Sequence, residues 1–92
     1  MALVDDLGST RLHWAALRDD VDQVRSLLAN HFPVNVANSL GDTPLHWATS
    51  AGAKKVAALL VKKGADVNAR NHAGETPLSL AADDETITSI LS

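Results

Sequence analysis

An internal repeat constrains this chain of 92 residues more than any other feature, because the 33 residues that separate Gly8 from Gly41 also separate Gly41 from Gly74. The other positions common to three copies are Thr10/Thr43/Thr76, Leu12/Leu45/Leu78 and Ala15/Ala48/Ala81. Pairs of copies also share His13/His46, Trp14/Trp47, Leu27/Leu60, Val34/Val67, Asn35/Asn68 and Pro44/Pro77. A unit this short cannot bury its apolar face alone, so the repeat predicts a stack of similar units.

The second copy begins with the signals of a turn followed by a helix. Gly41-Asp42 favours a tight turn. Thr43 is a good N-cap, because its hydroxyl can accept from a backbone N–H one turn ahead. Pro44 suits the first helical position, where a missing N–H costs nothing. Gly52 supplies the backbone freedom that ends this first helix.

A second helix is expected over residues 54–63 of the same copy. Its apolar side chains recur on one face, at Val56, Leu59 and Leu60. Lysines occupy its last turn, where the helix dipole favours cations, and Gly64 ends it. The following segment, 65–69, is predicted to be an extended link to the next turn.

These motifs together resemble one known family. The segment Gly41-x-Thr43-Pro44-Leu45-His46-x-Ala48, followed by Gly52, Leu59-Leu60 and Gly64-Ala65-Asp66-Val67-Asn68-Ala69, is similar to an ankyrin repeat. The resemblance extends from about Gly8 to the end of the chain. It implies an all-α ankyrin-repeat solenoid of stacked helix-turn-helix pairs with β-turn tips. The expected single domain covers residues 1–92, with repeats at about 6–38, 39–71 and 72–92.

The outer copies depart from the family pattern. The first copy has Arg11 in place of proline, Asp19 in place of the inner glycine and His31-Phe32-Pro33 in place of Gly-Ala-Asp. The third copy has Ser79 in place of histidine, and its second helix, over 85–92, is short and polar. Terminal repeats need a polar outer face, so we expect the first and third copies to be caps of a nearly complete array. A piece of a longer array is the alternative.

Charge and composition exclude several classes of protein. Hydrophobic residues make up 46% of the chain, which is too many for a disordered segment. The formal net charge of −3 argues against a nucleic-acid partner. Cysteine is absent, which rules out disulfides and thiolate sites. The run from Val56 to Val61 is too short to cross a membrane, and the N-terminus does not resemble a signal peptide. We expect a cytoplasmic or nuclear protein that is monomeric when free.

No residue pattern indicates catalysis, a metal or a cofactor. His13 and His46 lie one repeat apart, and helices stack at about 8–10 Å, which is too far for one ion to bridge both rings. The family resemblance implies instead that each of these histidines hydrogen-bonds the N-capping threonine. His31 and His72 lack zinc-ligand spacing. Nucleophile elbows and phosphate loops are absent, and the paired aspartates are sequence neighbours at Asp5-Asp6, Asp19-Asp20 and Asp83-Asp84.

Two tryptophans, Trp14 and Trp47, follow the histidine in successive copies. The favoured interpretation is packing, since the family usually has a large apolar residue there and Leu80 fills the site in the third copy. The alternative is that indole edges face a groove and anchor a partner, as tryptophans often do at binding hot spots.

The family resemblance implies that a partner contacts the turn tips and inner helices on the concave side. Carried over position by position, the predicted contact residues are Leu7, Ser9, Trp14, Arg18, Ser39, Leu40, Asp42, Trp47, Ser50, Ala51, His72, Ala73, Glu75, Asp83 and Asp84, with Leu17 beside them. This set contains four acids and one base, so the expected partner is a protein with a basic or apolar-basic segment.

The basic residues of the second copy, Lys54, Lys55, Lys62 and Lys63, fall at the two ends of its outer helix. A solvated face is the favoured interpretation, and a secondary contact with an acidic partner is the alternative. The sequence as a whole favours a protein-binding adaptor or small inhibitor without catalytic activity. The competing interpretation is a scaffold fragment, or an engineered consensus-like array, without a dedicated partner.

Overall fold

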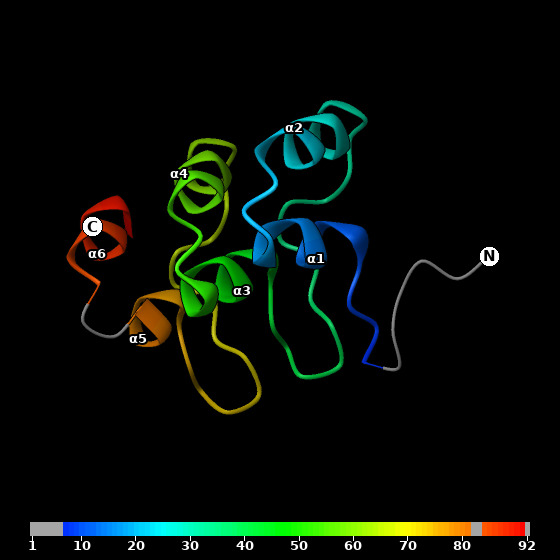
Figure 1. The fold of residues 1–92 in the computed structure, drawn as a ribbon. Coiled ribbons are helices and arrows are strands. Elements are labelled where there is room, and N and C mark those ends of the chain that lie inside the picture. Colours follow the sequence, from blue (N-terminus) through cyan, green and yellow to red (C-terminus); the bar gives the residue numbers. More distant parts are fainter. Residues whose placement is uncertain (1–6, 82–83, 92) are drawn as a thin grey trace.

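The computed structural model describes residues 7–81 and 84–91, which form three helix pairs and no strand. The helices are α1 (Arg11–Leu17), α2 (Val21–Ala29), α3 (Pro44–Ala51), α4 (Lys54–Lys62), α5 (Pro77–Ala81) and α6 (Glu85–Leu91). Figure 1 shows α1, α3 and α5 as an inner layer that lies between the long turns and the outer helices α2, α4 and α6. The predicted all-α stack of helix-turn-helix pairs is therefore confirmed.

The inner helices begin as the sequence predicts. Thr10 and Thr43 are the N-caps of α1 and α3, and each threonine hydroxyl accepts from the backbone N–H of the histidine three residues on. In return, each threonine backbone N–H donates to the histidine Nδ1, over 3.0 Å at His13 and 3.1 Å at His46. This reciprocal pair satisfies two N–H groups at the helix start that have no partner within the helix. The predicted bond between histidine and capping threonine is confirmed.

The same histidines also connect neighbouring repeats. Because Nδ1 accepts a hydrogen bond, the ring proton lies on Nε2, which donates to a backbone carbonyl of the next turn. The distances are 2.7 Å from His13 to the oxygen of Asp42 and 2.9 Å from His46 to that of Glu75. Both rings are fully buried. Each histidine therefore fixes the geometry of its own turn and that of the turn after it.

Ser79, which replaces the histidine in the third copy, makes only the local half of this arrangement. Its hydroxyl accepts from the backbone N–H of Thr76 over 3.0 Å, as the imidazole does in the other copies. The hydroxyl donates to the carbonyl of Thr76 itself over 2.8 Å. A serine side chain is too short to reach a neighbouring turn, so the substitution keeps the cap and omits the connection between repeats.

Two departures in the first copy occur where the backbone is left-handed. Asp19 has φ 56° where its counterpart Gly52 has φ 72°, and His31 has φ 65° where Gly64 has φ 96°. Aspartate and histidine tolerate this conformation better than most residues do. The Oδ1 atom of Asp19 also accepts from the backbone N–H of Val56 over 2.9 Å.

This bond from Asp19 supplies a missing helix cap. The N-cap of α4 is Ala53, which has no side-chain oxygen, whereas Asp20 caps the equivalent helix α2 through the N–H of Gln23. Val56 is the residue of the second copy that corresponds to Gln23. The first repeat therefore caps a helix of the second, which joins the two repeats through the outer layer.

The core lies between the inner and outer layers. Its largest fully buried apolar side chains are Leu12, Val24, Leu45, Val56, Leu60 and Ile87. Small alanines on the inner helices, among them Ala15 and Ala48, let these layers approach closely. The second helix of the middle copy ends at Lys62, one residue before the predicted boundary. Among the described residues, no helix is long and apolar enough to cross a membrane.

Candidate functional site

The turns that project from the inner layer are shaped by two asparagines that the sequence interpretation missed. The Oδ1 of Asn38 accepts from the N–H groups of Leu40 and Asp42, both over 3.0 Å. Asn71 does the same for Ala73 and Glu75, over 3.0 and 2.9 Å. The signal was present, since each asparagine precedes a repeat glycine by three residues and the two match at the repeat offset. Side-chain bonds of this kind fix turn conformation.

Backbone bonds join each turn tip to the next. The N–H of Ser39 donates to the carbonyl of Leu7 over 2.7 Å, and the N–H of His72 donates to that of Leu40 over 2.9 Å. Gly41 is close to this second contact, because a Cβ at this position would come within 2.9 Å of the His72 backbone nitrogen. The tips therefore form a continuous edge rather than separate loops.

The asparagine amides link neighbouring turns, and the link differs between copies. In the second turn, Asn38 Nδ2 donates to Ser9 Oγ over 3.0 Å, and Ser9 is fully buried. Ser9 therefore belongs to the turn scaffold rather than to an accessible contact surface, contrary to the prediction. In the third turn, Asn71 Nδ2 donates both to Asp42 Oδ1 over 2.8 Å and to Glu75 Oε1 over 2.9 Å. Two carboxylates from successive repeats are thus held on the same donor group.

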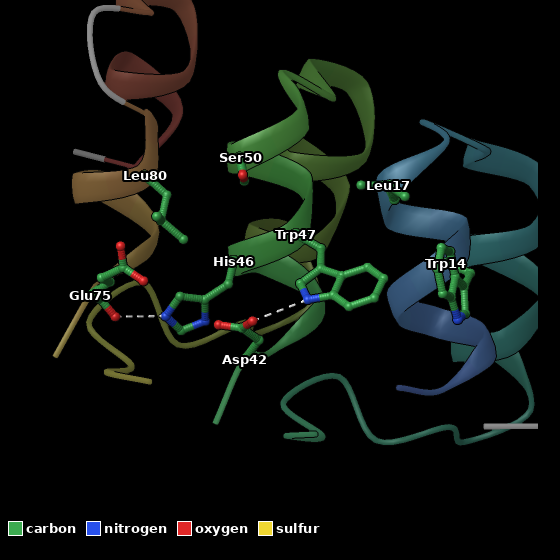
Figure 2. A pocket seen from close by; sticks show the side chains of 8 residues that line it. All are labelled: Trp14, Leu17, Asp42, His46, Trp47, Ser50, Glu75 and Leu80. Atoms are coloured by element: carbon green, nitrogen blue, oxygen red, sulfur yellow. Dashed lines mark hydrogen bonds between the residues drawn. The ribbon is translucent and has the colours of Figure 1, made fainter. Parts of the chain in front are cut away.

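A hollow of about 340 Å³ lies beside these carboxylates, on the side of the inner helices that the family resemblance predicts to be concave. Figure 2 shows its lining side chains, which come from α1, α3, α5 and the turns before α3 and α5; they are Trp14, Leu17, Asp42, His46, Trp47, Ser50, Glu75 and Leu80. Leu80 was predicted only as a packing residue. The hollow spans three repeats, which agrees with a groove built by the solenoid as a whole.

The two tryptophans of the hollow have different roles. Their rings meet edge to face, with centroids 4.9 Å apart and planes at 90°, and Trp47 also meets the ring of His13 at 5.3 Å. Trp47 Nε1 donates to Asp42 Oδ2 over 3.3 Å (Figure 2). Trp47 is half-buried and packs between repeats, whereas Trp14 is 36% exposed. Packing accounts for Trp47, and an accessible indole face remains on Trp14.

The other predicted contact residues that the structure describes lie at the turn tips or near helix ends. Those at the exposed turn tips are Leu7, Ser39, Leu40, His72 and Ala73. Arg18 and Ala51 are exposed at the ends of α1 and α3. Asp84 is only partly buried, and its Oδ1 accepts from the N–H of Ile87 at the start of α6. Asp83 lies outside the described residues.

The hollow offers hydrogen-bond acceptors and apolar surface. Among the described residues that line it, none is lysine or arginine. His46 uses both ring nitrogens in the scaffold bonds. Within residues 7–81 and 84–91, no three or more His, Cys, Asp or Glu side chains lie together so that they could hold a metal ion.

Comparison with known proteins agrees with this geometry. The family model described as ankyrin repeats, in three copies, matches residues 1–71, which is more than half of the chain. No curated protein sequence matches the chain. Ankyrin repeats are in general protein–protein interaction modules without catalytic activity. The chain belongs to the ankyrin-repeat family.

Proposed function

We propose that this chain is a non-catalytic adaptor or small inhibitor that binds a partner protein through the concave hollow and the turn tips. The partner segment is basic, or combines basic and apolar side chains. The observation that supports this most strongly is the combination of accessible apolar side chains and two carboxylates in a single hollow.

The apolar part of the surface is concentrated on the concave side. The exposed fraction is 36% for Trp14 and 39% for Leu17 on α1, and 40% for Leu7 and 48% for Leu40 at the turn tips; Leu78 on α5 is 46% exposed. Isolated exposed leucines are common on protein surfaces, but apolar side chains gathered beside a hollow are typical of interaction sites. Trp14, with Leu17 and Leu80 in the lining of the same hollow, gives a partner side chain an apolar anchor of the kind found at binding hot spots.

The charged part of the surface favours a cation. Asp42 and Glu75 hold their carboxylates at the edge of the hollow through Asn71, and no lysine or arginine lines it among the described residues. A guanidinium or ammonium group that enters here gains from the carboxylates and from the tryptophan face together. Such complementarity mainly raises the association rate and the selectivity of a complex.

The scaffold holds this surface in place before a partner arrives. The buried histidines fix the inner helices against the turns, and the tip-to-tip backbone bonds fix the turns against each other. Less ordering on binding leaves more of the contact energy as affinity.

The test is capture of proteins from the source cell's lysate by the native chain and by two variants. The first variant carries Leu17→Ala, Leu40→Ala and Glu75→Gln, which shorten two exposed leucines and remove one exposed negative charge without changing Asp42 or its bonding partners. The matched control carries three exposed changes on α2, namely Asp22→Asn, Gln23→Ala and Ser26→Ala. Circular dichroism establishes that all three proteins are folded.

The proposal predicts a protein that is captured by the native chain and by the α2 control and is lost with the concave variant. That capture should weaken when the salt concentration rises past about 0.1 M, since exposed charge pairs are screened there. Equal capture by both variants would contradict the concave site.

A further inference from the structure

The outer face carries a second groove, between α2 and α4, that the concave surface does not involve. Two hollows of about 370 and 350 Å³ lie there, and they share Arg25, Leu59 and Lys62. Because three residues line both, the hollows form one continuous groove along the pair of outer helices. Its existence follows from the packing: α2 and α4 contact each other far less than α1 and α3 do.

The lining of this outer groove combines apolar and basic side chains. Its apolar lining consists of the partly buried Val21, Leu28 and Leu59 and the exposed Ala29 and Ala58. The remaining lining residues are all cations: Arg25 rises from α2, and Lys55, Lys62 and Lys63 come from α4 or its C-cap. None of the described residues that line either hollow is acidic.

The position of the apolar residues distinguishes between two occupants. An interfacial membrane protein inserts protruding apolar side chains into the bilayer. The exposed large hydrophobic residues of the described chain are Leu7, Trp14, Leu17, Leu40 and Leu78, and none of them lies on α2 or α4. Here the larger apolar side chains, Val21, Leu28 and Leu59, are partly buried. They lie between Arg25 on α2 and the lysines of α4, so a narrow segment fits them better than a flat surface does.

From this arrangement we infer that the outer groove binds an acidic amphipathic helix of a protein partner. The apolar stripe of that helix packs on Leu28 and Leu59, and its flanking carboxylates pair with Arg25 on one rim and with Lys62 on the other. The nine residues of α2 give the groove a length of about 13 Å, which accommodates two to three helical turns. The inference does not depend on the concave site, because the two surfaces share no lining residue.

A defined probe tests this inference. We would titrate the full chain into a fluorescein-labelled helical peptide of about 15 residues, built from Glu, Ala and Leu with its leucines at helical spacing. The variant Arg25→Gln/Lys62→Gln should weaken binding about tenfold, which is the loss expected for two moderately strong charge pairs. The matched control Arg11→Gln/Arg70→Gln changes the net charge equally at exposed positions outside the groove and should bind as the native chain does.

Two further measurements separate the groove from a mere patch of charge. A peptide of the same charge, with glutamine in place of leucine, should bind at least about tenfold more weakly. In nuclear magnetic resonance spectra, the peptide should shift the amide signals of α2 and α4 and leave the indole signals of Trp14 and Trp47 in place.

Several results would overturn the inference. These are no measurable binding of the acidic peptide, equal weakening by both double variants, equal affinity for the peptide without leucines, or shifts on the concave indoles alone. Binding to vesicles of phosphatidylcholine and phosphatidylserine, lost in Arg25→Gln/Lys62→Gln while the peptide does not bind, would assign the groove to a membrane surface instead.

Discussion

Asp19 should stabilise the stack through its bond to the N–H of Val56, and substitutions at this one position separate two opposing effects. Asp19→Ala removes the cap and keeps a side chain in the left-handed region, where φ is 56°. Loss of a helix cap costs about 1 kcal/mol, within a range of about 0.5–2 kcal/mol. Alanine tolerates the left-handed region less well than aspartate does, which adds a few tenths. The expected total loss is about 1–1.5 kcal/mol.

The two other substitutions are expected to change stability much less. Asp19→Gly loses the same cap and relieves about 1 kcal/mol of backbone strain, so the two effects nearly cancel. Asp19→Asn keeps an oxygen acceptor and loses only the charge at the helix start, a change of about 0.5 kcal/mol. The expected order of stability is therefore native, Gly and Asn close together, with Ala lowest.

Urea unfolding followed by circular dichroism measures these differences. A domain of this size has about 5–10 kcal/mol of stability, so 1 kcal/mol is well resolved. The reasoning is refuted if Asp19→Ala is as stable as the native chain. It is refuted equally if Asp19→Gly is more stable than the native chain by all of the backbone strain that glycine relieves, because then the bond to Val56 contributes nothing.

The other predictions concern the inner helices and turns and use the same unfolding assay. His46→Ala should cost about 2–4 kcal/mol, because it leaves the carbonyl of Glu75 and the N–H of the buried Thr43 without their partner. Alanine at the exposed His72 should cost under about 0.5 kcal/mol. Equal losses would contradict the role of His46. Gly41→Ala should cost more than Gly74→Ala by at least about 1 kcal/mol, since both positions are left-handed but only at Gly41 does a Cβ meet backbone, at 2.9 Å. Similar losses at the two glycines would show that tip-to-tip contact is loose.

The sequence predicted those elements that depend on local spacing. The threonine cap, the proline that begins α3 and the pairing of helices repeat along the chain, so one copy explains the others. The bond between the histidine and the cap was implied by the family resemblance. The predicted helix over 54–63 extends one residue beyond the end of α4, because helix propensity does not end sharply at a lysine. The asparagines of the turns were overlooked although they obey the same period, and they determine where Asp42 and Glu75 lie.

Contacts between repeats could not be predicted from one copy at a time. Its position in the turn predicted that Ser9 lies on the surface, yet its hydroxyl is buried and accepts a hydrogen bond from the amide of Asn38. Asp19 looked like a defect in the glycine pattern, because the helix it caps lies in the next repeat. Arg25 showed no connection with Lys62 until α2 and α4 were placed side by side. These relations depend on how the repeats stack, and the spacing of residues along the chain does not contain them.

The central claim is that the concave side of this ankyrin stack is the surface that a partner protein contacts. Site-specific photo-crosslinking tests it most directly, with benzoylphenylalanine placed at the exposed Leu40 on a turn tip or, as the control, at the exposed Ser26 on α2. In the source cell's lysate, the probe at Leu40 should yield a discrete protein adduct that decreases as salt is raised, and the probe at Ser26 should not capture that same protein. Capture of that protein from Ser26 alone, or no adduct from Leu40, would contradict the claim.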